Sequence, residues 1–179
     1  MTTYIGLLRA INIGPRNRVA MGDLRTMCAA IGLDEAKTLL ASGNVVFQSR
    51  IASSDKIEQS LEAASTKHLG VTTDYFVRSA EEWQAIIKAN PFPKDARSDP
   101  GHLLLMCLRS APTAAQVSAL QAAIKGREIV KARGKQAYLV YPDGVGRSKL
   151  TIQVIEKALG TRGTARNWNT VLKLGELAQ

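Results

Sequence analysis

The chain has 179 residues, a net charge of +9 and 45% hydrophobic residues. This composition argues against a disordered chain and fits one or two domains with a real hydrophobic core. No apolar run approaches the roughly 18 residues of a membrane span, and the start has no secretory signal. The sequence therefore predicts a cytoplasmic protein without membrane contact. Cys28 and Cys107 lie in apolar runs and are expected to be reduced and buried.

The first half of the chain is predicted to follow the order strand, helix, strand, strand, helix, strand. The predicted elements are strand 3–10, helix 21–31, strand 36–41, strand 44–48, a helix capped by Ser53 or Ser54, and strand 73–78. Gly32 stands where the first helix should end. Ser42-Gly43 predicts a tight hairpin between the second and third strands.

A second helix and a proline-rich segment follow this first half. Ser79 with Glu82 three residues later is typical of a capping box at a helix start. Three prolines in the polar run 91–101 mark a connection between the two halves. We therefore expect a first subdomain with its connecting helix over 1–90, a linker over 91–101, and a second subdomain with a C-terminal helix over 102–179.

The second half repeats the order of the first. Its predicted elements are strand 102–109, a helix capped by Thr113, strands 128–132 and 137–141, a helix capped by Ser148, strand 162–165, and a terminal helix capped by Asn167. In the terminal helix, Val171, Leu172 and Leu174 are expected to face the core. Each half is a βαββαβ unit. The predicted fold is α+β, with two ferredoxin-like subdomains, a connecting helix and a C-terminal helix.

Three stretches carry a family resemblance. They are Leu-Leu-Arg-Ala-Ile-Asn-Ile-Gly at 7–14, Ala-Ser-Gly-Asn-Val-Val-Phe at 41–47, and Thr-Ala-Arg-Asn-Trp-Asn-Thr at 164–170. Together they resemble the bacterial domain-of-unknown-function family 1697 over nearly the whole chain. The resemblance implies two ferredoxin-like α+β subdomains and no established activity. Ala10 and Gly14-Pro15 stand where the family usually has a glycine and a glycine pair. Because proline has no N–H, this loop is a weaker anion cradle.

Positive charge is concentrated in the second half. Residues 91–179 hold 14 Lys and Arg against 6 Asp and Glu, whereas residues 1–90 hold 10 against 9. Such asymmetry favours an anionic partner, although many basic proteins bind none. Five cations from Lys125 to Lys135 either follow a phosphate backbone or protect a strand edge from pairing. The glycine-rich segment 144–149 is either an anion cup or a flexible loop.

Five polar residues from the motifs and from the glycine-rich segment form the predicted ligand-binding site: Arg9, Asn12, Lys149, Arg166 and Asn167. The two arginines would donate paired hydrogen bonds to carboxylate or phosphate oxygens, the asparagines would orient the ligand, and the lysine would add a point charge. We expect the site at a basic surface between the two subdomains. Alternatively, Arg166 forms an ion pair that ties the tail to the sheet. Trp168 is either a core residue or a stacking platform.

The sequence gives no motif for a metal, cofactor or catalytic site. His68 and His102 have no partners at ligand spacing, so we expect no metal, and no motif indicates a cofactor. No catalytic residue can be named. The first interpretation is a protein that binds an anionic small molecule or nucleic acid. The alternatives are a protein–protein or oligomerisation module without its own ligand, or a small-molecule enzyme of unknown reaction. The sequence leaves the oligomeric state open.

Overall fold

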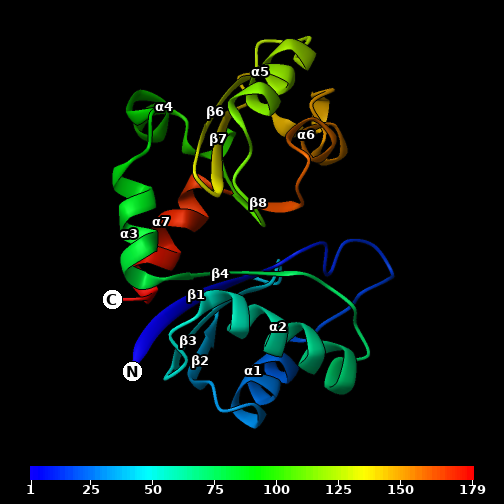
Figure 1. The fold of residues 1–179 in the computed structure, drawn as a ribbon, viewed down its shortest axis with the longest axis vertical. Coiled ribbons are helices and arrows are strands. Elements are labelled where there is room, and N and C mark those ends of the chain that lie inside the picture. The colour runs from blue at the N-terminus through cyan, green and yellow to red at the C-terminus, as the bar shows by residue number, and fades with distance from the viewer. The chain divides into compact units, whose positions relative to one another are not determined.

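A computed structural model describes residues 1–179, and the chain divides into two compact units (Figure 1). Unit 1 consists of Met1–Lys88 with Lys173–Gln179, and unit 2 of Ala89–Leu172. Each unit contains one four-stranded antiparallel sheet. The predicted fold class of two ferredoxin-like α+β subdomains is confirmed. The predicted domain limits, 1–90, 91–101 and 102–179, stay a prediction.

Unit 1 has a central β1 flanked by β3 and β4, in the sheet order β2-β3-β1-β4. Its elements are β1 (Thr2–Leu8), α1 (Met21–Ala30), β2 (Asp34–Thr38), β3 (Asn44–Ser49), α2 (Ser54–Ala64), the π-helical turn η1 (Ser65–Leu69), β4 (Tyr75–Ser79) and α3 (Ala80–Lys88). Tyr4 on β1 lies opposite Phe47 on β3 and Ser79 on β4. Leu7 lies opposite Asn44, so the end of β1 and the start of β3 lie side by side, next to the loops that carry two of the three motifs.

Alternation along the strands builds the core of unit 1. Tyr4, Phe47 and Val77 point to the face of the sheet that α1 and α2 cover (Figure 1), and Ile57 and Leu61 of α2 meet them there. All five side chains are buried because apolar residues recur every second position on the strands and every third or fourth on the helix. This core fixes the position from which the loops after β1 and β2 leave the sheet.

Unit 2 repeats the topology, with the sheet order β6-β7-β5-β8. Its elements are α4 (Pro93–Ser98), the 3₁₀ turn η2 (Pro100–His102), β5 (Leu103–Leu108), α5 (Ala114–Ala123), β6 (Ile129–Arg133), β7 (Gln136–Val140), the 3₁₀ turn η3 (Val145–Arg147), α6 (Ile152–Leu159), β8 (Gly163–Asn167) and α7 (Trp168–Leu177). The proline-rich segment 91–101 thus carries α4 and part of η2. The end of α7 belongs to unit 1, where Gln84 of α3 donates to the Gly175 carbonyl at 3.1 Å.

The core of unit 2 lies between its sheet and two helices. Met106 and Leu139 from the sheet pack with Leu120 of α5 and with Ile155 and Leu159 of α6. These side chains are at most 1% exposed. The opposite face of the sheet carries the next residues along each strand, because successive side chains alternate. Arg166 on β8 therefore points away from the α6 side, whereas Ala165 points toward it.

Four of the predicted helix caps are confirmed. The Ser53 hydroxyl accepts a hydrogen bond from the Lys56 N–H at 3.3 Å, and Thr113 forms a capping box with Gln116. The further caps are Ser79, which pairs reciprocally with Glu82, and Asn167, whose side-chain oxygen accepts from the Thr170 N–H. Each cap satisfies a helix-start N–H that has no partner within its helix.

Three local predictions were wrong. Thr151, not Ser148, caps α6, because the Ser148 hydroxyl accepts from the Leu150 N–H and donates to Glu128. The hairpin after β2 is a five-residue loop rather than a tight turn, since β2 ends at Thr38. Leu172 is 38% exposed, because only the α7 face carrying Val171 and Leu174 is buried.

The length and hydropathy of the helices and the state of the two cysteines can be read from the structure. None of the helices combines the length and the hydropathy needed to cross a lipid bilayer. Cys28 and Cys107 are free thiols and are buried, as predicted. Burial raises the pKa of the Cys28 thiol to about 12, so this thiol is neutral at physiological pH.

Candidate functional site

Arg9 leaves the sheet of unit 1 from a fixed point at the end of β1. Its backbone N–H donates to the Asp74 carbonyl at 3.0 Å, and its carbonyl accepts from the Thr73 hydroxyl at 2.6 Å. Both bonds tie it to the segment before β4. The side chain is half-buried. The predicted site residue Arg9 is therefore held at its backbone by the neighbouring strand, which restricts where its guanidinium reaches.

The side chain of Asn12 holds the loop after β1 together. Its Nδ2 donates to the carbonyls of Val19, at 3.0 Å, and Ala41, at 2.7 Å, while its Oδ1 accepts from the Val19 N–H at 2.9 Å. Both amide hydrogens are thus used inside the protein. Asn12 also has a φ of +55°, which asparagine tolerates better than most residues. These bonds make Asn12 a residue that shapes the loop.

Gly43 joins the first two family motifs. Its carbonyl accepts from the Leu8 N–H at 2.9 Å, and its φ is +84°. A Cβ at this position would lie 2.7 Å from Ile11 Cδ1 and 2.8 Å from Leu8 Cβ. Asn44 is fully buried, and its Nδ2 donates to the Leu39 carbonyl at 2.7 Å, so its amide is not presented to a ligand. The two motifs form one packed cluster at the end of the unit 1 sheet.

Ala10 in this cluster has a strained backbone, which yields a prediction of stability. Its φ of +52° lies in the left-handed region, where an L-residue costs about 1–2 kcal/mol. Ala10→Gly removes that cost but adds about 0.5–1 kcal/mol of unfolded-state entropy. We expect a net gain of about 0.5–1 kcal/mol in the free energy of unfolding, measured by urea titration. The same change at the exposed helical Ala29 should cost about 1 kcal/mol. A loss of stability from Ala10→Gly would contradict the assigned strain.

The third motif places Arg166, Asn167 and Trp168 at the junction of β8 and α7. Arg166 is only 9% exposed, and its Nη1 donates to the Thr164 hydroxyl at 2.8 Å and to the Ala165 carbonyl at 2.9 Å. Burial lowers the pKa of this guanidinium to about 10, so it stays charged at neutral pH. Asn167 is exposed, and its side-chain oxygen caps α7.

Trp168 is a core residue rather than a stacking platform. It is 3% exposed, and its ring centroid lies 6.4 Å from that of Tyr138 on β7, with the two planes tilted by 49°. Such tilted aromatic pairs add stability beyond the area that they bury. Burial also raises the pKa of Tyr138 to about 12. The aromatic pair anchors the start of α7, so that Arg166 and Asn167 are attached to rigid neighbours.

Lys149 lies in the loop between β7 and α6 and is exposed. Its neighbours Ser148 and Leu150 line a crevice of about 220 Å³ together with Ala165 and Ile155. Because Ala165 lies on the α6 side of β8, this loop is on the α6 side as well. Within unit 2, Lys149 and the buried Arg166 are therefore on different faces of the sheet. Within unit 1, Arg9 and Asn12 share the end of β1.

A counterpart of Arg166 in unit 1 was missed by the sequence analysis. Arg78 pairs with Ile5 of the central strand as Arg166 pairs with Leu105. Each of these arginines is buried, and its Nη1 donates to the carbonyl of the preceding residue, at 2.8 Å for Arg78 and 2.9 Å for Arg166. Each is followed by a helix cap, Ser79 or Asn167. The signal in the sequence is an arginine followed directly by a helix-capping residue at the end of β4 in unit 1 and of β8 in unit 2.

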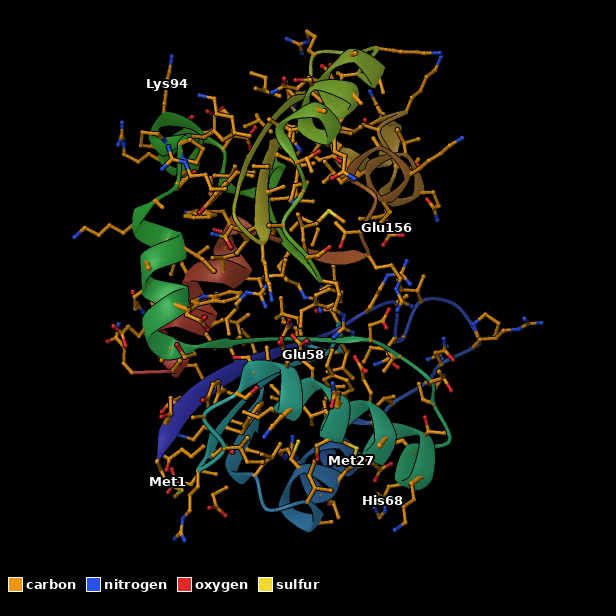
Figure 2. All side chains as sticks on the ribbon, in the orientation of Figure 1. Met1, Met27, Glu58, His68, Lys94 and Glu156 are labelled. Atoms are coloured by element: carbon orange, nitrogen blue, oxygen red, sulfur yellow. The ribbon has the colours of Figure 1, made fainter.

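The two arginines differ in their surroundings. Arg78 Nη1 lies 3.8 Å from Oε1 of Glu58, a buried residue of α2 beside β4 (Figure 2). The same oxygen accepts from the Val77 N–H at 2.8 Å. In unit 2, Arg166 Nη1 donates to the Thr164 hydroxyl. The duplicated arginine therefore has a carboxylate beside it in unit 1 and a hydroxyl beside it in unit 2.

The acidic and metal-ligating side chains do not gather. No group of three or more His, Cys, Asp or Glu side chains is placed to hold a metal ion. Nδ1 of His102 lies 2.8 Å from a carboxylate oxygen of Asp99, three residues before it. Arg127, one of the five cations predicted to form a basic ribbon, makes an ion pair with Asp143, and Lys131 lies over the Phe92 ring at 5.2 Å. Two of the five cations of this ribbon therefore interact with other side chains of unit 2.

Comparisons with known proteins agree with this fold. The structure of a conserved bacterial protein, SP0830 from Streptococcus pneumoniae, is similar with a TM-score of 0.78 and 23% identity, covering 99% of each chain. At that identity the likeness establishes the fold alone. No curated protein matches the chain. The model of the family described as protein of unknown function DUF1697 matches residues 1–138. The third motif, at 164–170, lies beyond the matched residues, but the match covers most of the chain, which therefore belongs to this family, as predicted.

Proposed function

We propose that the protein binds an anionic ligand, namely a nucleotide, a phosphate-bearing metabolite or a nucleic acid, through unit 2. The distribution of charge supports this proposal. Unit 2 holds 13 Lys and Arg against 5 Asp and Glu, a net of +8, out of +9 for the whole chain. Eleven of those 13 cationic residues are exposed. A dense field of one sign attracts anions and accelerates their association.

The predicted site residues have different roles in this proposal. Lys149 offers an exposed ammonium group in a glycine-rich loop. Arg166 carries a guanidinium group, which prefers planar oxyanions, on the opposite face of the unit 2 sheet, and Arg9 offers the same group in unit 1. Asn12 and Asn167 use their side chains to hold the loop after β1 and the start of α7, so they position the backbone. The proposal concerns binding, because no proton-transfer pair or nucleophile is identified among these residues.

A thermal-shift panel tests this proposal. Nucleotides, sugar phosphates and short oligonucleotides are each added to the whole chain at low and moderate salt. A ligand at 100 times its Kd adds about 2.7 kcal/mol to the stability of the native state. A shift from a small phosphate that survives added salt identifies a pocket ligand. A shift from oligonucleotides alone that falls steeply with salt identifies nucleic acid, since phosphate contacts release counterions. No shift with any anion would overturn the proposal and favour a protein partner.

We also propose a cytoplasmic location. Two buried free thiols in a chain without a disulfide support it, because reducing compartments keep cysteines unpaired. Cell fractionation with an antibody to the chain tests this, and recovery from the extracellular fraction would contradict it.

A further inference from the structure

A pocket of about 310 Å³ lies in unit 1 between the end of the loop after β1, one side of α1 and the turn η1. This volume is within the range of small-molecule sites and far exceeds the space that a single ion fills. Figure 2 shows Met27 of α1 and His68 of η1 near each other in unit 1. The lining residues that matter to its chemistry are Arg18, Val19, Asp23, Met27, His68 and Leu69.

Hydrogen bonds within unit 1 hold the walls of this pocket in place. The Asn12 side chain bonds both the N–H and the carbonyl of Val19, at 2.9 and 3.0 Å, and so fixes the segment that carries Arg18. On the other side, the buried Ser65 hydroxyl of η1 donates to Met27 Sδ of α1 at 3.6 Å. The pocket is therefore formed before any ligand arrives. The turn η1 is π-helical, a conformation that is frequent at functional sites.

Two opposite charges line the pocket without pairing. The side chains of Arg18 and Asp23 are exposed, and neither forms a hydrogen bond or an ion pair in the structure. Exposure alone does not explain this, because Arg127 and Asp143 in unit 2 are also exposed and do form an ion pair. The guanidinium and the carboxylate thus share one pocket and leave the space between them open to a ligand.

The signs of these charges limit the kind of ligand. The formal charges of Arg18 and Asp23 cancel, so a simple anion would be attracted by one and repelled by the other. A molecule that carries both a carboxylate and an ammonium group satisfies both side chains. The polar part of the pocket therefore complements a zwitterion.

We propose that this pocket binds a free α-amino acid with an apolar side chain. Arg18 donates paired hydrogen bonds to the α-carboxylate, and Asp23 accepts hydrogen bonds from the α-ammonium group. His68 adds ring nitrogens beside these polar groups. The side chain of the amino acid lies against the apolar part of the lining, which consists of Val19, Met27 and Leu69.

This site goes beyond the anion binding proposed for unit 2. All the lining residues belong to unit 1, and the ligand belongs to a different chemical class. The two proposals therefore stand or fall separately. Lys149→Ala, which removes an exposed cation of unit 2, should leave amino-acid binding unchanged.

An NMR titration of the whole chain with L-valine, L-leucine and L-methionine tests the proposal. We expect saturable shifts of backbone amide signals in residues 18–30 and 65–70, which surround the pocket. The amino acid that binds most tightly is then compared with its amide, which lacks the carboxylate, and with its deaminated acid, which lacks the ammonium group. Each analogue should bind at least about tenfold more weakly, because it loses one set of charge-assisted hydrogen bonds.

Substitutions of the two charged residues locate the site. Arg18→Gln and Asp23→Asn should each raise the Kd at least about tenfold. Arg16→Gln is the matched control for the first, since Arg16 is an exposed arginine of the same loop outside the lining. Asp55→Asn is the control for the second, since Asp55 is exposed in the first turn of α2. In about 0.15 M salt, where distant charges are screened, both controls should change the Kd less than about threefold.

Each other outcome overturns the proposal. The pocket is not an amino-acid site if none of the three amino acids gives a saturable shift, or if the shifts fall outside residues 18–30 and 65–70. An analogue that binds as tightly as its parent shows that the ligand need not be a zwitterion. Equal losses from the site variants and their controls show that only the overall charge matters.

Discussion

Gly43→Ala should lower the free energy of unfolding by about 2–5 kcal/mol, because two costs add at this position. A φ of +84° is strained for any residue with a Cβ. In addition, the new Cβ would lie within 2.9 Å of the side chains of Ile11 and Leu8, which are themselves buried. The loop after β1 and the loop after β2 cannot both keep their positions. We therefore expect a lower Tm and a lower urea midpoint.

Gly70→Ala separates the two costs. Gly70 has a φ of +65°, but nothing lies within 4 Å of a Cβ built on it. It should show the backbone strain alone, about 1–2 kcal/mol. Equal effects of Gly43→Ala and Gly70→Ala would mean that the close approach between the first two motifs is unimportant, and the packed cluster at the end of β1 would be wrong.

The fold could be predicted because its signals are local. Ile57, Leu61 and Ala64 recur at helical spacing, and Tyr75 and Val77 alternate along β4, so neighbouring residues alone specify these elements. The βαββαβ order then follows in both halves. Errors arose where two local signals compete. Ser148 and Thr151 both precede the apolar residues of α6, and the choice is seen only in the structure, where the Thr151 hydroxyl accepts from the Val154 N–H while Ser148 bonds Leu150 and the distant Glu128.

The candidate site was less predictable, because its contacts are distant in sequence. Asn12 reads as a ligand-binding amide until its bond to Ala41, 29 residues away, is known. Ala10 and Leu40 have left-handed backbone conformations, which their residue types do not indicate. The equivalence of Arg78 and Arg166 requires strand register, because it depends on pairing with Ile5 and Leu105.

Glu58→Ala should be the most damaging single substitution considered, at about 3–5 kcal/mol, because it removes one member of a buried charged pair. Glu58 is 4% exposed and Arg78 is 7% exposed. The alanine leaves the guanidinium of Arg78 without the carboxylate that lies 3.8 Å away. It also removes the acceptor of the Val77 N–H on β4. Both losses fall on the strand that leads into α3.

Glu58→Gln distinguishes these two losses. Glutamine retains a side-chain oxygen to accept from the Val77 N–H but carries no charge, so a cost of about 1–3 kcal/mol, smaller than that of the alanine, is expected. Glu176→Ala, which removes an exposed glutamate from α7, should stay within about 0.5 kcal/mol of the wild type. If the glutamine costs as much as the alanine, the charge on Glu58 dominates. If neither costs more than Glu176→Ala, the carboxylate does not stabilise the buried arginine.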